Sequence, residues 1–341
     1  MQFSFGYRWQ HSDRHFTGAS EDLNRNREHS QVVNDIHILD FALTYGITER
    51  ISGTVSLPVL IMNRTQPIRN GAGTIIDHNE TNGNGIGDMS LVFQGWILKP
   101  STHTDQNVAI STGAKFPTGN DDLRDVFKRA NGTRFEQAVD QSIQPGDGGF
   151  GWILGIQAFK QVNLGTEAVK VPITLYGQGT YLFNPRNTNG TLTGRGRASE
   201  AEMSVPDAYL ARLGFAVPIP VFETRPFAFT LGGRIEGVPP KDAIGDSDGF
   251  RRPGYAVSIE PGLVYSWRKN IFAVSFPVAL YRDRQRSVPD IRDNAHGDAA
   301  FADFLVLFSF AHRFGGPQPP AEAKPEAATA AAIFQNGDPL Q

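Results

Sequence analysis

Near the end of this chain, apolar and polar side chains alternate with a period of two. Over residues 301–314 this alternation predicts a β-strand with one apolar and one polar face. Segments of similar length repeat the pattern, and the sequence contains no long uncharged apolar run of the kind that forms a membrane-spanning helix. The sequence therefore predicts an all-β chain that forms a transmembrane, antiparallel, up-and-down β-barrel. The apolar positions in this segment are Phe304, Val306, Phe308, Phe310 and Phe314.

Residues typical of turns divide the chain into twelve candidate strands. The connections alternate between long and short, as in a barrel with long outer loops and short periplasmic turns. The expected strands are 2–10, 36–47, 50–62, 87–98, 107–117, 150–160, 168–182, 208–218, 226–237, 254–267, 271–282 and 302–314. The long connections are 11–35, 63–86, 118–149, 183–207, 238–253 and 283–301.

Composition agrees with a barrel and excludes several other classes. A mean hydropathy of −0.30 suits a chain in which only alternate strand residues are apolar. The net charge is −3, and Lys and Arg are scattered singly, so we expect no nucleic-acid partner. The sequence has no Cys, which excludes disulfides, thiolate metal sites and Cys nucleophiles.

We expect two regions, a barrel over residues 1–314 and a flexible periplasmic tail rich in Pro and Ala over 315–341. The chain starts with a strand-like segment that lacks the features of a secretory leader. A bacterial outer-membrane barrel must be exported. We therefore expect that a leader is missing from this sequence.

Side-chain parity assigns the apolar positions to lipid and the opposite positions to the lumen. Charges of both signs fall on the lumen side, where they can pair across the barrel instead of lying in hydrocarbon. Two interpretations stay open, ion pairs that hold the wall together and side chains that select a solute. The candidate selectivity set is Asp40, Asp88, Lys115, Arg212, Arg234, Glu236 and Glu260.

Other chemistry is weakly indicated. His11 and His15 are four residues apart, but on a loop that leaves a strand this spacing does not form a zinc site. Residues 77–88 resemble a calcium loop, although Asn82 and Asp88 replace the Gly and Glu that such a loop needs. We expect a solvated outer loop there and no cofactor or metal, with weak calcium binding left as an alternative. No Ser lies in a nucleophile-elbow context, so we expect no enzyme.

Three strings resemble the outer-membrane transporter family of the phenol meta-degradation pathway. They are residues 39–50 leading to Val55-Ser56-Leu57-Pro58, residues 85–91, and residues 113–119, in the order and roughly the spacing of that family. The resemblance is clear over about residues 36–120. It implies a small outer-membrane barrel that passes aromatic or other hydrophobic molecules.

The last strand also resembles the terminal signal that the barrel-assembly machinery reads, with Phe310, Arg313 and Phe314 as its residues. Here a tail follows Phe314, where chains with this signal normally stop. The partners expected are thus outer-membrane lipid, the assembly machinery and a small hydrophobic solute that diffuses passively. The alternatives are a closed structural or adhesion barrel without transport and, third, an outer-membrane hydrolase.

Overall fold

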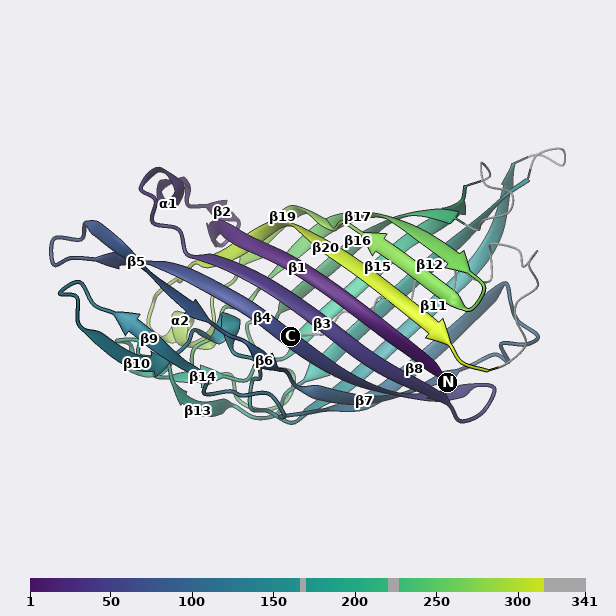
Figure 1. Cartoon of the computed structure of the whole chain (residues 1–341), viewed down its shortest axis with the longest axis horizontal. Coiled ribbons are helices and arrows are strands. Elements are labelled where there is room, and N and C mark those ends of the chain that lie inside the picture. Colours follow the sequence, from purple (N-terminus) through teal and green to yellow (C-terminus); the bar gives the residue numbers. More distant parts are fainter. Residues whose placement is uncertain (166–169, 220–226, 316–341) are drawn as a thin grey trace.

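The computed structural model describes residues 1–165, 170–219 and 227–315, which form a closed barrel of twelve antiparallel strands (Figure 1). The last strand pairs with the first and closes the wall. The wall strands are β1 (Gln2–Thr17), β3 (Val33–Gly46), β4 (Ile51–Arg69), β7 (Met89–Trp96), β8 (Gln106–Phe116), β11 (Gly151–Gly165), β12 (Lys170–Phe183), β15 (Ala208–Pro218), β16 (Phe227–Val238), β17 (Gly254–Trp267), an interrupted strand made of β18 (Asn270–Ser275) and β19 (Val278–Arg284), and β20 (Ala299–Arg313).

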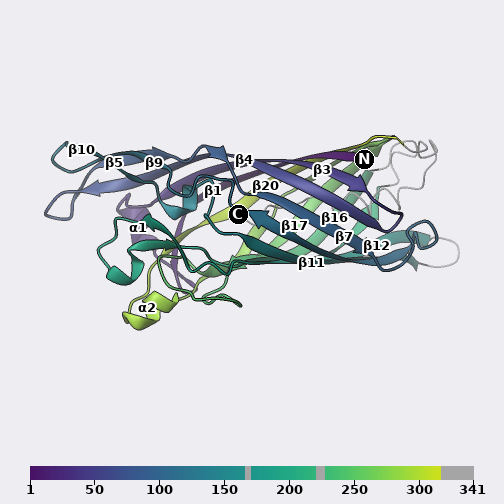
Figure 2. The same ribbon diagram turned by 90° about the horizontal axis from the view of Figure 1, so that it is seen from below.

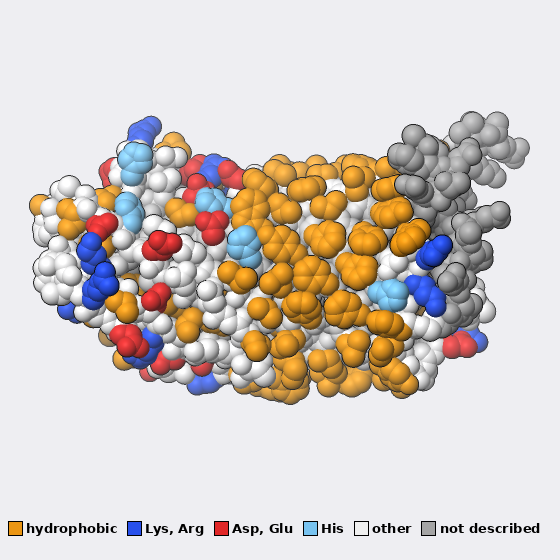
Figure 3. All heavy atoms as spheres, viewed as in Figure 1, with side chains coloured by type: hydrophobic (Ala, Val, Ile, Leu, Met, Phe, Trp, Pro, Cys, Tyr) orange, Lys and Arg blue, Asp and Glu red, His pale blue; other side chains and the backbone are white. Residues whose placement is uncertain are grey.

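The two faces of the wall follow the alternation in the sequence. Along β18, β19 and the residues between them, Phe276, Val278 and Leu280 are exposed on the outside, whereas Ile271 and Ala273 are buried. On the face drawn in Figure 3, the outward apolar side chains form a continuous band over the barrel, with charged side chains beyond its outer edge. Such a band is typical of a wall that faces lipid. No helix of the described residues is long and apolar enough to cross a membrane.

The long connections lie at the end of the barrel opposite the N-terminus (Figures 1 and 2). They contain more regular structure than the sequence indicates. In α2, for example, Ser287 and Asp290 form a reciprocal capping box. The elements in these connections are β2 (Ser20–Glu21), α1 (Leu23–Arg27), β5 (Ile75–Asn82), β6 (Gly85–Ile86), β9 (Arg124–Lys128), β10 (Arg134–Ala138), η1 (Gln141–Ile143), β13 (Thr188–Leu192), η2 (Ala198–Glu200), β14 (Glu202–Ser204) and α2 (Val288–Arg292).

Several expected strands differ from the structure in their bounds, for example β4, which was expected to end at residue 62 and continues to Arg69. The first was expected to end at residue 10, but β1 continues to Thr17, beyond the apolar band, where a strand needs no apolar face. The expected strand 271–282 is interrupted between Ser275 and Val278, because Pro277 has no backbone N–H to give to the ladder.

One outer connection folds back over the inside of the wall. Val139 and Ile143 are fully buried against Ile38, Leu60 and Met62, which are inward residues of β3 and β4. Residues 139–147 are called the inward segment below. It covers an apolar patch on the inner face of the wall that would otherwise meet water.

The expected tail, residues 315–341, lies outside the described residues except for Gly315. Residues 166–169 and 220–226, in two of the expected short turns, are also outside them. The division into barrel and tail therefore stays a prediction.

Candidate functional site

Paired charges line the inner face of three neighbouring strands. Arg212 on β15 donates to both carboxylate oxygens of Glu260 on β17, at 3.1 and 2.7 Å. Ser275 donates to the same carboxylate at 2.9 Å. Arg234 on β16 lies 2.5 Å from Glu236 and 4.0 Å from Glu260. Hydrogen bonds of this kind offset part of the desolvation cost of the buried charges.

This network extends across the lumen through Arg8 on β1. Its guanidinium donates to both oxygens of Glu236 on β16, at 3.0 and 3.1 Å. Strands β20, β19 and β17 separate β1 from β16 in the barrel, so the pair spans the interior. The Arg8–Glu236 pair and the charges beside it are called the charged belt below.

A second cluster fixes the inward segment to the wall. Lys115 on β8 donates to Asp88 at 3.1 Å and to Asp147 on the inward segment. Asp88 also accepts hydrogen bonds from the backbone N–H groups of Gly119, at 2.9 Å, and of Asp147, at 3.3 Å. One buried ammonium thus joins the wall to the connection that crosses the lumen.

A cavity of about 430 Å³ lies between the inward segment and the charged belt, and is called the inner cavity. Arg8 and Glu236 form part of its lining, and residues of the inward segment from Gln141 to Asp147 form another part. A large share of the remaining lining is apolar, which suits a ligand with few polar groups. The apolar lining includes Ile36, Ile38, Leu60, Met62, Leu182 and Leu210.

The inner cavity also reaches the barrel wall where the interrupted strand meets β20. Strand β18 pairs with β20 along its whole length, but β19 pairs with β20 only at Val278 and Phe304. Beyond that pair, residues 279–284 are paired with β17 and residues 299–303 with β1. Residues 279–283 and 299–303 are called the wall opening below. Pro277, Ala279, Ala299, Ala300, Ala302 and Phe304 line the cavity there.

One side chain spans the wall opening. Arg282 of β19 donates to the carbonyl oxygen of Ala302 at 3.0 Å and to the carboxylate of Asp303 at 2.6 Å. Arg14 on β1 also contacts Asp303, at 2.5 Å. The outer end is bounded by the backbone bridge between Gly18 and Arg284. At the opening, the side chain of Arg282 therefore joins the two strands. Elsewhere in the described wall, backbone hydrogen bonds join neighbouring strands.

Most of the candidate selectivity residues lie in these clusters. Asp88 and Lys115 form the ion pair just described, and Arg212, Arg234, Glu236 and Glu260 belong to the charged belt. Asp40 is half-buried on β3, in register with Gly6 of β1. The arrangement is compatible with either interpretation of the charges, wall-holding pairs or selectivity.

The candidate assembly signal is at the end of the barrel that holds the N-terminus. The ring of Phe310 packs on that of Phe272, with centroids 5.0 Å apart. Arg313 donates its backbone N–H to Lys269, and Phe314 donates to Met1 at 2.8 Å. The terminal residues are thus part of the closing seam, and their recognition by a partner stays a prediction.

The residues considered above as possible metal ligands pair with other side chains in the structure. His11 lies 2.8 Å from Asp35 and His15 lies 2.8 Å from Asp298. Asp77 lies in strand β5 and pairs with Lys128, whereas Asp88 pairs with Lys115. Among the described residues, no group of three or more His, Cys, Asp or Glu is arranged to hold a metal ion.

The sequence reasoning did not find the residues that anchor the inward segment. Asp140 accepts two hydrogen bonds of 2.7 Å from Arg252 and lies 3.3 Å from Arg64. Burial alone would raise the pKa of the Asp140 carboxyl, but Arg252 and Arg64 outweigh it and hold that pKa well below its usual range. These contacts join distant segments, so no local pattern indicates them. The interruption of the wall strand, in contrast, had a visible signal in Pro277.

No protein-family model matches this sequence, and no curated protein is similar to it. Solved structures with a similar fold include an outer-membrane channel from Pseudomonas putida F1. It is 12% identical, with a TM-score of 0.54 over 92% of this chain and 94% of that chain. This similarity shows a shared β-barrel fold.

Two more distant structures are also similar. The toluene transporter TodX of Pseudomonas putida is 8% identical, with a TM-score of 0.43 over 92% of this chain and 89% of that chain. The translocator domain of the autotransporter NalP from Neisseria meningitidis is 9% identical, with a TM-score of 0.43 over 92% and 88%. At this distance they serve only as further examples of barrels.

Proposed function

We propose that this protein is a bacterial outer-membrane channel that passes small hydrophobic molecules, aromatic ones included, by passive diffusion. The observation that carries the proposal is the inner cavity, which has apolar walls and reaches a gap in the backbone pairing of the barrel. The resemblance of residues 36–120 to the phenol-pathway transporters supports the aromatic class, and the fold shared with the Pseudomonas putida channel supports the membrane.

The route that we propose runs from the outer end into the inner cavity and sideways through the wall opening. The direct route to the other end of the barrel passes the charged belt, where Arg8 and Glu236 bond across the lumen. An apolar solute cannot replace those hydrogen bonds, so its passage would leave the Arg8 guanidinium without its carboxylate partner. At the wall opening it meets Ala279, Ala300 and Ala302, whose small side chains leave room.

In this proposal the candidate selectivity residues close the direct passage through the barrel to water and inorganic ions. Asp88 and Lys115 hold the inward segment, while the charged belt blocks the direct passage. We also propose that Phe310, Arg313 and Phe314 are read by the barrel-assembly machinery during insertion.

The experiment uses the absence of Cys in the natural sequence. Ala302→Cys places a single thiol at the wall opening, and a bulky methanethiosulfonate reagent then attaches a group that a reductant removes. The control is Ala158→Cys, on β11 with the same parity as exposed Trp152 and Ile156. Uptake of labelled toluene is measured in outer-membrane vesicles from strains with and without the protein.

We expect the reagent to reduce toluene uptake through Ala302→Cys, and the reductant to restore it, while Ala158→Cys is unaffected. Equal uptake by vesicles with and without the unmodified protein would end the transport proposal. If toluene uptake is present but the reagent does not reduce it in either variant, the sideways route is rejected.

One observation favours a second candidate, a closed structural barrel without transport. The Arg8–Glu236 pair spans the lumen, and in a closed barrel such a pair would serve only to brace the walls. Planar-bilayer recording and the toluene measurement separate the two. The closed barrel predicts no conductance and no protein-dependent uptake.

A further inference from the structure

A second cavity, of about 380 Å³, adjoins the inner cavity on its outer side and is called the outer cavity. The two share Asn34, Ser142 and Arg252 in their linings, together with Ala299 and Ala300. The two cavities therefore adjoin at these residues. The lining of the outer cavity is more polar, and its charged residues are Arg25, Arg64, Asp140, Arg195, Arg252 and Asp298.

Positive charge exceeds negative charge around the outer cavity. Asp140 is shared by Arg252 and Arg64, so one carboxylate serves two guanidinium groups. Arg195 lies 3.4 Å from Glu200, and Glu200 also pairs with Arg197 at 3.1 Å. The carboxylates present thus leave the arginines of this region only partly neutralised.

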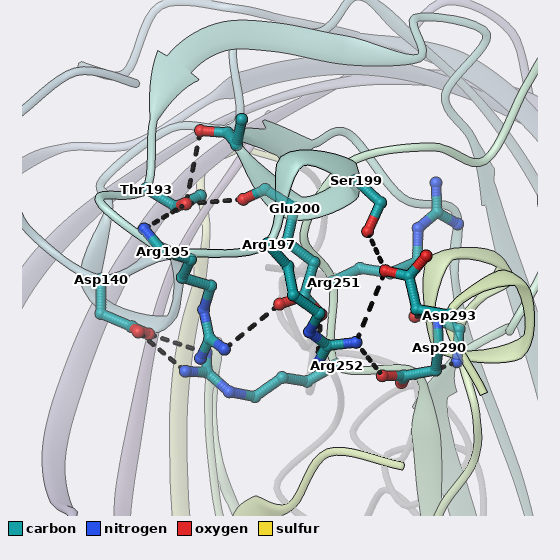
Figure 4. Close-up of polar contacts among 12 residues, drawn as sticks. Asp140, Thr193, Arg195, Arg197, Ser199, Glu200, Arg251, Arg252, Asp290 and Asp293 are labelled. Carbon is teal, nitrogen blue, oxygen red and sulfur yellow. Dashed lines mark hydrogen bonds and ion pairs between the residues drawn. The ribbon is translucent and has the colours of Figure 1, made fainter. Parts of the chain in front are cut away.

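Three of these arginines gather close together. The guanidinium carbons of Arg195 and Arg252 lie 3.7 and 4.6 Å from the centre of the Phe250 ring. Figure 4 shows the two side chains converging beside Asp140, in the outer connections of the barrel. Burial, and next the charge of Arg252, lower the pKa of Arg195, as expected for cations held together in a partly desolvated place.

The third, Arg64, is buried, with 8% of its side chain exposed. It donates to Asn34 at 2.8 Å, and its Nε has no hydrogen-bond partner among the described residues. An unused donor on a buried cation is costly, and an anion in the cavity would offset that cost. Arg195, in contrast, is 39% exposed and can turn toward a ligand.

We propose that the two cavities together bind an organic anion with an apolar body, its carboxylate at Arg195, Arg252 and Arg64 and its body on the apolar wall of the inner cavity. This inference rests on the proposed function and narrows its substrate class. Charge-assisted hydrogen bonds to guanidinium groups supply the recognition of the carboxylate. Ile38, Leu60 and Met62 supply the apolar contact.

The test compares two probes of nearly equal shape, 4-phenylbutanoate and its neutral amide, by calorimetry on the full chain in detergent micelles. We expect the carboxylate to bind at least about tenfold more tightly, the effect of one charge-assisted hydrogen bond. In Arg195→Gln we expect this preference to fall by about tenfold, and Arg195→Lys should keep part of it.

The matched control is Arg197→Gln. Arg197 belongs to the same connection and contacts the same Glu200, but it does not line either cavity. Its loss should leave the preference for the carboxylate unchanged.

Equal binding of acid and amide by the natural protein would overturn the inference, and so would equal effects of Arg195→Gln and Arg197→Gln. Toluene uptake distinguishes this failure from that of the proposed function. If uptake persists while the charge preference is absent, only the anion site is lost.

Discussion

Arg8 and Glu236 are joined by two hydrogen bonds, of 3.0 and 3.1 Å, although their strands are not neighbours in the barrel. A barrel of twelve strands leaves little free space once inward side chains fill it. Here an ion pair joins two strands that three other strands separate, and it forms part of the lining of the inner cavity.

The first prediction concerns this pair. Arg8→Ala removes the side chain that crosses the lumen and leaves Glu236 its contact with Arg234. We expect a larger single-channel conductance than in the natural protein, because water and ions gain a path beside Glu236. The control is Lys99→Ala, which removes an exposed ion pair with Glu49 outside the lumen. Equal conductance in all three proteins would show that the pair does not limit passage.

The second prediction concerns the fit of the inward segment. A Cβ added at Gly83 would lie 1.8 Å from the carbonyl oxygen of Ile143, so Gly83→Ala must displace the segment. We expect the free energy of unfolding in urea to fall by about 1–3 kcal/mol, as for other overpacked sites. Gly71→Ala is the control, because an added Cβ there meets no described atom within 4 Å. Equal stability of the two variants would contradict the close packing.

The third prediction is a pH dependence at Asp140. Its pKa is lower in the folded protein than in the unfolded chain, so its ion pairs stabilise the fold at pH values above the unfolded pKa. The stabilisation is lost as the pH falls through the folded pKa. We expect hydrogen exchange of the inward segment, corrected for intrinsic rates, to be constant down to about pH 5 and to accelerate below about pH 4. Asp140→Asn should abolish this dependence, and an unchanged profile in that variant would assign it to other groups.

The fourth prediction concerns the side chain across the wall opening. Arg282→Ala removes the hydrogen bonds to Ala302 and Asp303, and Asp303 keeps its contact with Arg14. We expect faster toluene uptake, because the side chain that spans the opening is then gone while Ala279, Ala300 and Ala302 still line it. Arg268→Ala, in the turn before β18, serves as a control with the same loss of charge. Slower uptake than in the natural protein would show that Arg282 guides the solute instead of closing the gap.

The sequence predicted the strands of the barrel wall better than the contacts inside the barrel. Period-two alternation depends only on which face of a strand meets lipid, so Phe276 and Leu280 could be placed outside from local sequence. The ion pair of Asp88 and Lys115 could also be inferred from the sequence, because both residues belong to neighbouring expected strands and share the inward parity. The contacts of Asp140 and Ile143 could not be inferred from the sequence, because they depend on how a long connection folds back over distant strands.

The interrupted strand also constrains where the membrane surface can lie. Backbone amides and carbonyls without a ladder partner cannot face hydrocarbon, because nothing there replaces the missing hydrogen bonds. Residues 279–283 and 299–303 diverge from each other just beyond Val278 and Phe304. The headgroup layer of the outer leaflet is therefore expected to reach about the level of that last pair. Tyr281 then lies among the lipid headgroups. The mouth of the opening lies at the boundary between the polar and acyl regions of the membrane.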